Sequence, residues 1–430
     1  MAAEANGARA AAENAARQSY GKLVAFLAAR TRDVAGAEDA LADAFAAALE
    51  RWPRDGVPDR PEAWLLAVAR RRGIDAVRRR LTREAGQDHL ALVAEELEAG
   101  MAEQEIPDER LRLLFACAHP AIDPAVRAPL ILQTVLGLDA ATIASAFLVS
   151  PAAMSQRLVR AKSRIREAGI PFKVPEPAGF AERLDAVLEA IYAAYAEGWS
   201  DPAGADAQRR DLAGEGIWLG RVAVSLMPAE PEALGLLALM LYAESRRGAR
   251  RNADGDYVPL AEQDFSLWDG GMIAEAEDLL SRAGAMQKIG RYQLEAAVQS
   301  AHAARRHSDD ADWPAIRQLY DALAVLSGSP VASINRAVAI AEIDGAQAGL
   351  SALDGLASDG RLAEYQPYFA ARAVLLARLE RAAEAAEAYD RAIGLERDPA
   401  VRRFLQERRR ALGAMAEAPQ PSPSNSTVDR

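Results

Sequence analysis

The chain has 430 residues, of which 50% are hydrophobic and 6% aromatic, and its formal net charge is −11. Its single cysteine, Cys117, excludes an intrachain disulfide and suits a reducing compartment, and the first ten residues lack the apolar core of a signal peptide. The longest apolar stretch, Leu234–Tyr242, is about half of the ~20 residues that a membrane span needs. Alanine and leucine dominate and runs of β-branched residues are nearly absent, so we predict an all-α, cytoplasmic protein without membrane contact.

Three helices are predicted in residues 15–83. The first covers about Ala15–Arg30, and the second, Ala37–Trp52, has one apolar stripe: Leu41, Ala44, Phe45, Ala48 and Leu49. Three prolines and Asp55-Gly56 end the second helix, and Pro61 begins a third that runs to Arg83. Residues 51–83 hold ten arginines and four acids, a net charge of +6. An aromatic side chain such as Trp64 beside arginines is typical of a surface that binds unpaired nucleic acid. An equally good interpretation is that Trp64 belongs to the core and the arginines are solvated.

Residues 84–107 are predicted to be an acidic linker, because residues 84–109 contain nine acids and neither lysine nor arginine. Helices are expected over Asp108–Ala118, from Pro124 to Gly137 and over Ala140–Phe147. Ser150 and Pro151 form the start of a further helix, which Gly169 ends. The short helix, its tight turn and this last helix predict a helix-turn-helix within residues 108–172.

The last of these helices separates its side chains by kind. Its buried stripe is predicted to be Met154, Leu158, Ala161 and Ile165. Basic residues flank an outer ridge of Gln156, Val159 and Ser163. A helix that enters a DNA groove needs cations for the phosphates and short or amide side chains for the base edges. We therefore favour DNA binding over an ordinary solvated face.

A proline-rich stretch, Pro171–Phe180, marks the boundary of a long helical extension, residues 173–413. Within it Asn335–Leu356 resembles Ala371–Ile393, with Gly345 and Glu380 at equivalent turns 35 residues apart. This spacing predicts tetratricopeptide-like helix pairs, with generic antiparallel hairpins as the alternative. Residues 414–430 are predicted to be a disordered tail by composition.

Few residues indicate catalysis or metal binding. Cys117 and His119 are two ligands at most, and His302 and His307 are too loosely spaced for a metal site. The chain contains no phosphate loop, nucleophile elbow or dinucleotide fingerprint. We predict no catalytic residue, no metal and no cofactor; an enzyme within residues 173–412 is a distant alternative.

Three segments together resemble a known family. AEDALADAFAAALERW, WLLAVARRRGIDAVRR and SQRLVRAKSRIR follow one another in the order and spacing of bacterial extracytoplasmic-function sigma factors of the sigma-70 family. The resemblance covers residues 15–172 and implies a region-2 helical bundle (15–83), the linker and a region-4 helix-turn-helix domain (108–172). The long extension is similar to that of a subgroup with a helical, tetratricopeptide-like domain.

The resemblance implies core RNA polymerase and promoter DNA as partners. Polymerase binding is predicted for the second helix: Glu38, Asp39, Leu41, Asp43 and Phe45. Melting and reading of a −10 element is predicted for the third: Trp64, Arg70, Arg71, Asp75, Arg78 and Arg79. Reading of a −35 element is predicted for the last: Ser155, Gln156, Arg157, Arg160, Lys162 and Arg164. The acidic linker would thread the RNA exit path as a mimic of nucleic acid.

The chain departs from the family pattern at a few positions. Arg71 stands where asparagine is usual, Ala42 where glutamine is common, and Ala152-Ala153 where Gly-Thr is common. These departures affect which promoter sequence is expected to be read more than they affect the expected role as a sigma factor. The extension would regulate activity through a regulatory protein or an intramolecular contact. The alternative is a helix-turn-helix regulator with a repeat-type sensor domain, acting without replacing a sigma factor.

Overall fold

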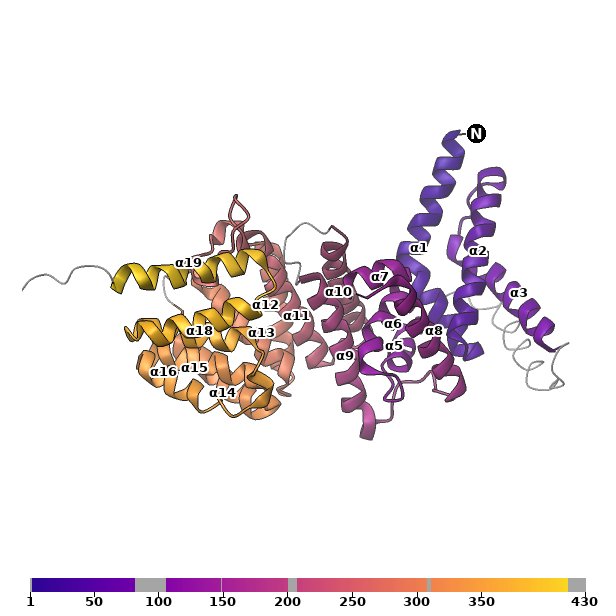
Figure 1. The fold of residues 1–430 in the computed structure, drawn as a ribbon. Coiled ribbons are helices and arrows are strands. Elements are labelled where there is room, and N and C mark those ends of the chain that lie inside the picture. The colour runs from indigo at the N-terminus through magenta and orange to yellow at the C-terminus, as the bar shows by residue number, and fades with distance from the viewer. Residues whose placement is uncertain (1, 82–105, 148, 200–206, 308–310, 417–430) are drawn as a thin grey trace, which may run out of the picture. The chain divides into compact units, whose positions relative to one another are not determined.

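The computed structural model describes residues 2–81, 106–147, 149–199, 207–307 and 311–416 (Figure 1). Every named element in these ranges is a helix, and the extended backbone there makes one isolated bridge, between Arg251 and Tyr257. The predicted all-α class is confirmed. Nearly all of the predicted linker and tail lie outside the described residues.

The chain divides into two compact units. The first comprises Met1–Ser200 and Asp206–Leu226, and the second comprises Asp201–Ala205 and Met227–Arg430. The helices of the first unit are α1 (Ala2–Thr31), α2 (Val34–Asp55), α3 (Pro61–Leu81), α5 (Arg110–Cys117), α6 (Pro124–Leu136), α7 (Ala140–Ala146), α8 (Pro151–Glu167), α9 (Pro177–Trp199) and α10 (Ala207–Leu226).

Helices α1, α2 and α3 pack against one another as a three-helix bundle. The Asp33 side chain accepts a hydrogen bond from the Gly36 N–H and begins α2, and Gly56, at φ 84°, follows its last residue. Helix α1 starts thirteen residues earlier than predicted, and Ala8, Ala12 and Ala15 on it are buried at helical spacing. The predicted stripe of α2 is buried at Leu41, Ala44 and Ala48, but Leu49 was misplaced in it, since its side chain is 51% exposed.

Helices α5 to α8 form the second part of this unit, and α6 contacts α5, α7, α8 and α9. Helices α6 and α8 begin where the sequence predicted, at Pro124 and Pro151. Asp123 caps α6, Gly137 (φ 74°) ends it in the left-handed conformation, and the Ser150 hydroxyl accepts from the Ala153 N–H at 3.3 Å at the start of α8. The pair α9 and α10 also packs within this unit, through α5, α6 and α7.

The second unit consists of successive helices that pack on their neighbours in the chain. They are α11 (Pro231–Ser245), α12 (Gly270–Ala285), α13 (Arg291–Ala303), α14 (Trp313–Ser327), α15 (Pro330–Asp344), α16 (Ala346–Asp354), α17 (Gln366–Arg378), α18 (Ala382–Leu395) and α19 (Pro399–Ala416). In the described part of this unit, short 3-10 turns lie between them at 247–250, 260–262, 265–267, 304–306 and 360–362.

The two turns that the sequence placed in equivalent positions both contain a residue with positive φ. Gly345 joins α15 to α16 at φ 91°, and Glu380 lies between α17 and α18 at φ 58°. Side chains of these four helices and α19 form one apolar cluster. Paired helices are therefore observed, while their tetratricopeptide-like character stays a prediction. Within the described ranges no helix is long and apolar enough to span a lipid bilayer.

Candidate nucleic-acid interface

Helix α8 presents two different faces. Its buried residues are the four that the sequence predicted: Met154, Leu158, Ala161 and Ile165. Five of the six residues predicted to read a −35 element are exposed: Ser155, Gln156, Arg157, Arg160 and Arg164. Val159 lies among them with its side chain 57% exposed. An apolar group between arginines can contact a thymine methyl, so Val159 belongs to this face although the predicted site omitted it.

A hollow of about 420 Å³ lies beside this face. Three arginines of α8 line it together with residues around the start of α6: Arg157, Arg160, Arg164, Asp123 and Val126 among them. Three guanidinium groups around a concave surface with a single carboxylate suit a polyanion. The exposed face of α8 beside this hollow is therefore basic.

Lys162 differs from its neighbours on α8. Its Nζ lies 2.6 Å from Oε2 of Glu38 on α2 and 2.9 Å from Oε1 of Gln133 on α6. The side chains of Lys162 and Glu38 are only 11% and 12% exposed. The sequence assigned these two residues to separate partners, DNA and polymerase, and the structure brings them together. Their separation of 124 positions gave no sequence signal for this contact.

The predicted polymerase-binding residues of α2 divide by exposure. Asp39 and Asp43 are exposed, and Phe45 is half-buried. Leu41 has no exposed surface and belongs to the core of the bundle. The surface of α2 available to a partner is therefore acidic, with Phe45 at its side.

Helix α3 carries the residues predicted for a −10 element. Arg71 is exposed, whereas Arg70 is 7% exposed and its guanidinium lies 4.8 Å from the centre of the Phe26 ring. Trp64 is half-buried and meets the buried Trp52 edge-on, with ring centroids 5.5 Å apart. Both therefore pack on the bundle. The side chains of three further predicted residues lie outside the described ones: Asp75, Arg78 and Arg79.

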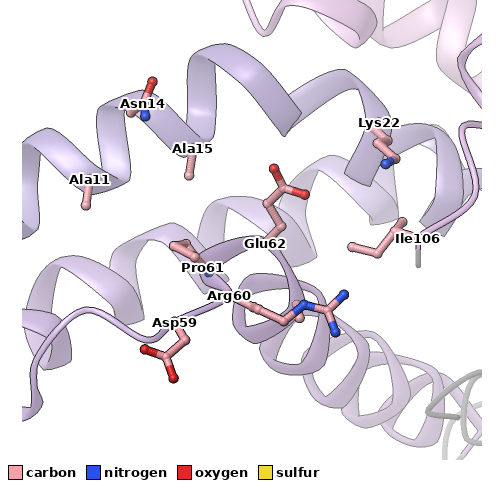
Figure 2. A pocket seen from close by; sticks show the side chains of 10 residues that line it. Ala11, Asn14, Ala15, Lys22, Asp59, Arg60, Pro61, Glu62 and Ile106 are labelled. Atoms are coloured by element: carbon pink, nitrogen blue, oxygen red, sulfur yellow. The ribbon is translucent and has the colours of Figure 1, made fainter. Parts of the chain in front are cut away.

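A second hollow, of about 660 Å³, lies between α1 and the start of α3. Figure 2 shows Ala11 and Asn14 on α1 across from the segment 59–62, with Glu62 directed toward α1. The Glu62 carboxylate accepts a hydrogen bond from the Ser19 hydroxyl. Lys22 and Arg60 balance Asp59 and Glu62 in the lining, so the hollow has no dominant charge. The sequence gave no sign of it, because three separate segments line it: α1, residues 59–63 and Ile106.

The buried thiol of Cys117 is a packing group. Its Sγ lies 3.5 Å from the Thr134 hydroxyl, and burial raises its pKa to about 12. His119 accepts a hydrogen bond at Nδ1 from the Ala121 N–H. No three potential metal ligands gather anywhere in the part of the chain that the structure describes.

Two family models match the chain. Residues 16–83, which span the second half of α1 and all of α2 and α3, match the family described as Sigma-70 region 2. Residues 183–284, from α9 to α12, match a family of unknown function, DUF6596. Residues 16–83 are therefore similar to region 2 of sigma-70 proteins.

The chain is also 42% identical over 389 residues to the uncharacterized protein R00370 of Rhizobium meliloti (strain 1021). The aligned part covers 88% of this chain and 89% of that protein, so the two belong to one family over nearly their whole lengths. No solved structure matches the chain.

Proposed function

We propose that this protein is a sigma factor that binds core RNA polymerase and directs it to promoters with −10 and −35 elements. The sigma-70 region 2 match over the α1–α3 bundle carries the proposal. The exposed, arginine-rich face of α8 supports a second DNA contact in a predicted region 4. The cytoplasm, where polymerase and promoter are found, is the proposed location.

The roles follow from exposure and charge. Asp39 and Asp43 on α2 would contact polymerase, and Arg71 with the arginines further along α3 would contact the melted −10 strand. Arg157 and Arg160 on α8 would hold the phosphates of a −35 duplex while Gln156 faces the base edges. Charge steering supports this assignment, because acidic α2 and basic α8 would attract different partners.

The second unit is proposed to regulate activity by contact with another protein or with the remainder of the chain. Consecutive helix pairs offer an extended surface for such a contact. The alternative, a regulator that binds duplex DNA without polymerase, leaves the region 2 match over residues 16–83 without a use. We therefore favour the sigma factor.

Run-off transcription with purified core polymerase and genomic promoter fragments tests the proposal. The protein should start specific transcripts, and Asp43→Arg should abolish both core binding and transcription, because it reverses the charge of the exposed α2 surface. Asp55→Arg, at the exposed end of the same helix, is the matched control and should keep both. Specific binding to duplex DNA without any transcript would favour the regulator instead.

A further inference from the structure

The basic face of α8 continues onto the junction between α5 and α6, residues 119–127. Residues of this junction line the hollow beside α8 together with the α8 arginines: Ala121, Ile122, Asp123, Ala125 and Val126. Nε of Arg127 donates to the Ile122 carbonyl oxygen at 3.1 Å. Nδ1 of His119 accepts from the Ala121 N–H, also at 3.1 Å. The side chains of Arg127 and His119 are therefore held by the same backbone that lines the hollow.

Helix α9 adds a cation to this junction. It packs against both α5 and α6, and Arg183 in its second turn donates from Nη2 to the Phe115 carbonyl oxygen of α5. Nη1 of Arg183 makes no hydrogen bond in the part of the chain that the structure describes. Burial lowers the pKa of His119, and the positive charges of Arg183 and Arg127 lower it further. The three basic side chains thus lie near one another at the junction.

Much of the positive charge at this surface is unpaired. Within the described residues, five arginines have no carboxylate at salt-bridge distance: Arg127, Arg157, Arg160, Arg164 and Arg183. The Asp123 carboxylate lies in the hollow, where it accepts from the Ala125 N–H, and Glu182 precedes Arg183 in the chain. These two acids leave a surplus of positive charge. Guanidinium groups that are unpaired and already held in place form strong, charge-assisted hydrogen bonds with phosphate oxygens.

We propose that α9 takes part in promoter binding, with Arg183 and Arg127 holding phosphates of the duplex that flanks the −35 element under α8. The proposal rests on the proposed function. Duplex DNA is the occupant because the surface is continuous with α8, whose exposed side chains suit a DNA groove. Contacts to phosphates position a protein on DNA without reading its sequence. Arg183 is the first residue of the match to DUF6596, so this contact gives that family of unknown function a role in DNA binding.

The salt dependence of binding tests the contact. The full chain assembled with core polymerase is titrated with a duplex that contains the −35 element and its flanks but no −10 element, so that strand opening does not contribute. Each phosphate contact adds about 0.9 to the slope of log affinity against log salt concentration. We expect Arg183→Ala to reduce this slope by about 0.9 and Arg183→Lys, which keeps the charge, to restore it. Arg183→Ala should also weaken binding to an unrelated duplex by the same factor, because phosphates carry no sequence information.

Arg112→Ala is the matched control. Arg112 lies on the neighbouring α5, but its Nε is 2.9 Å from Oε2 of Glu109, so its charge is already balanced and the slope should stay unchanged. Arg183 also supports the Phe115 carbonyl group, so Arg127→Ala is the second variant and should reduce the slope by a similar amount.

An unchanged slope in Arg183→Ala and Arg127→Ala overturns the proposal, even where affinity falls, because a purely structural role lowers affinity without releasing fewer counterions. An equal loss of slope in Arg112→Ala overturns it as well. If the wild type starts no specific transcript with core polymerase, the proposed function itself fails. A wild type that transcribes, with variants that keep its slope, defeats the α9 contact alone.

Discussion

His302, near the end of α13, is held neutral by its surroundings. Burial lowers its pKa to about 4, and the positive charges of Arg246 and Arg305 add to this effect. Its ring lies edge-on to Trp313, with centroids 6.0 Å apart. Among the described residues, its Nδ1 has no hydrogen-bond partner. A proton on this imidazole would therefore meet two cations in a site that solvates it poorly.

The sign of the pH effect follows from this depressed pKa. The unfolded chain binds a proton at His302 below the ordinary value of 6.5, whereas the folded chain does so only below about 4. Stability is therefore lost as pH falls through this window, by about 2 kcal/mol at pH 5. We expect wild type to lose about this much more free energy of unfolding than His302→Asn between pH 7.5 and pH 5, measured by urea denaturation. Parallel losses would show that His302 is not responsible.

At the scale of single residues, the sequence predicted the face of a helix on which a side chain lies better than the neighbours that the side chain contacts. Periodicity placed Arg70 and Lys162 outside the apolar stripes of their own helices, and that placement suggested external contacts. Arg70 instead lies against the Phe26 ring, and Lys162 pairs with Glu38 from a distant helix. A helical wheel reports only the axis of its own helix, so it cannot show which neighbouring element covers a given flank.

Helix ends were the most predictable elements, because caps are local. Asp139 accepts hydrogen bonds from the Ala141 and Thr142 N–H groups at 2.9 and 2.8 Å, and these bonds lower its pKa. Ser150 acts in the same way for α8. The pairing of α8 with α2 involves no local sequence signal. The alanine-rich N-terminal sequence shows too little difference between apolar and polar positions to predict where α1 begins. Local chemistry thus indicates where capped helices such as α6 and α8 begin, while it indicates neither where α1 begins nor which helices pack together.

Helix α8 allows a test that separates base reading from general attraction. Arg160 is exposed beside the groove-like hollow, so Arg160→Ala should weaken specific binding to a −35 duplex by about 1–3 kcal/mol if it contacts a base. Lys173→Ala removes an exposed charge beyond the end of the helix and should have a much smaller effect. The measurement is a footprinting titration at fixed salt, since phosphate contacts depend on ionic strength. Equal effects of the two substitutions would count against α8 as the reading helix.

The whole molecule divides at a different place from the proline-rich stretch that the sequence marked. The first compact unit extends to Leu226 and includes α9 and α10. Arg183 donates to the Phe115 carbonyl oxygen, the Phe115 and Phe180 rings lie 5.7 Å apart, and Arg110 lies over the Trp218 ring at 5.7 Å. Prolines indicate where a helix ends, but they do not indicate where a compact unit ends. The domain boundary predicted at residue 173 therefore stays a prediction.

Truncation distinguishes these two boundaries. A chain that ends at residue 172 loses the cover that α9 provides for the fully buried Phe115 and should lose at least about 2 kcal/mol of unfolding free energy relative to one that ends at Leu226. Urea denaturation of both fragments measures the difference, and equal midpoints and slopes would show that α9 and α10 add nothing. Residues 1–226 keep the whole first unit, so a comparison of their transcription activity with that of the full chain measures the effect of the second unit. Higher activity of the fragment would identify the second unit as an inhibitor, and lower activity would show that the second unit supports transcription.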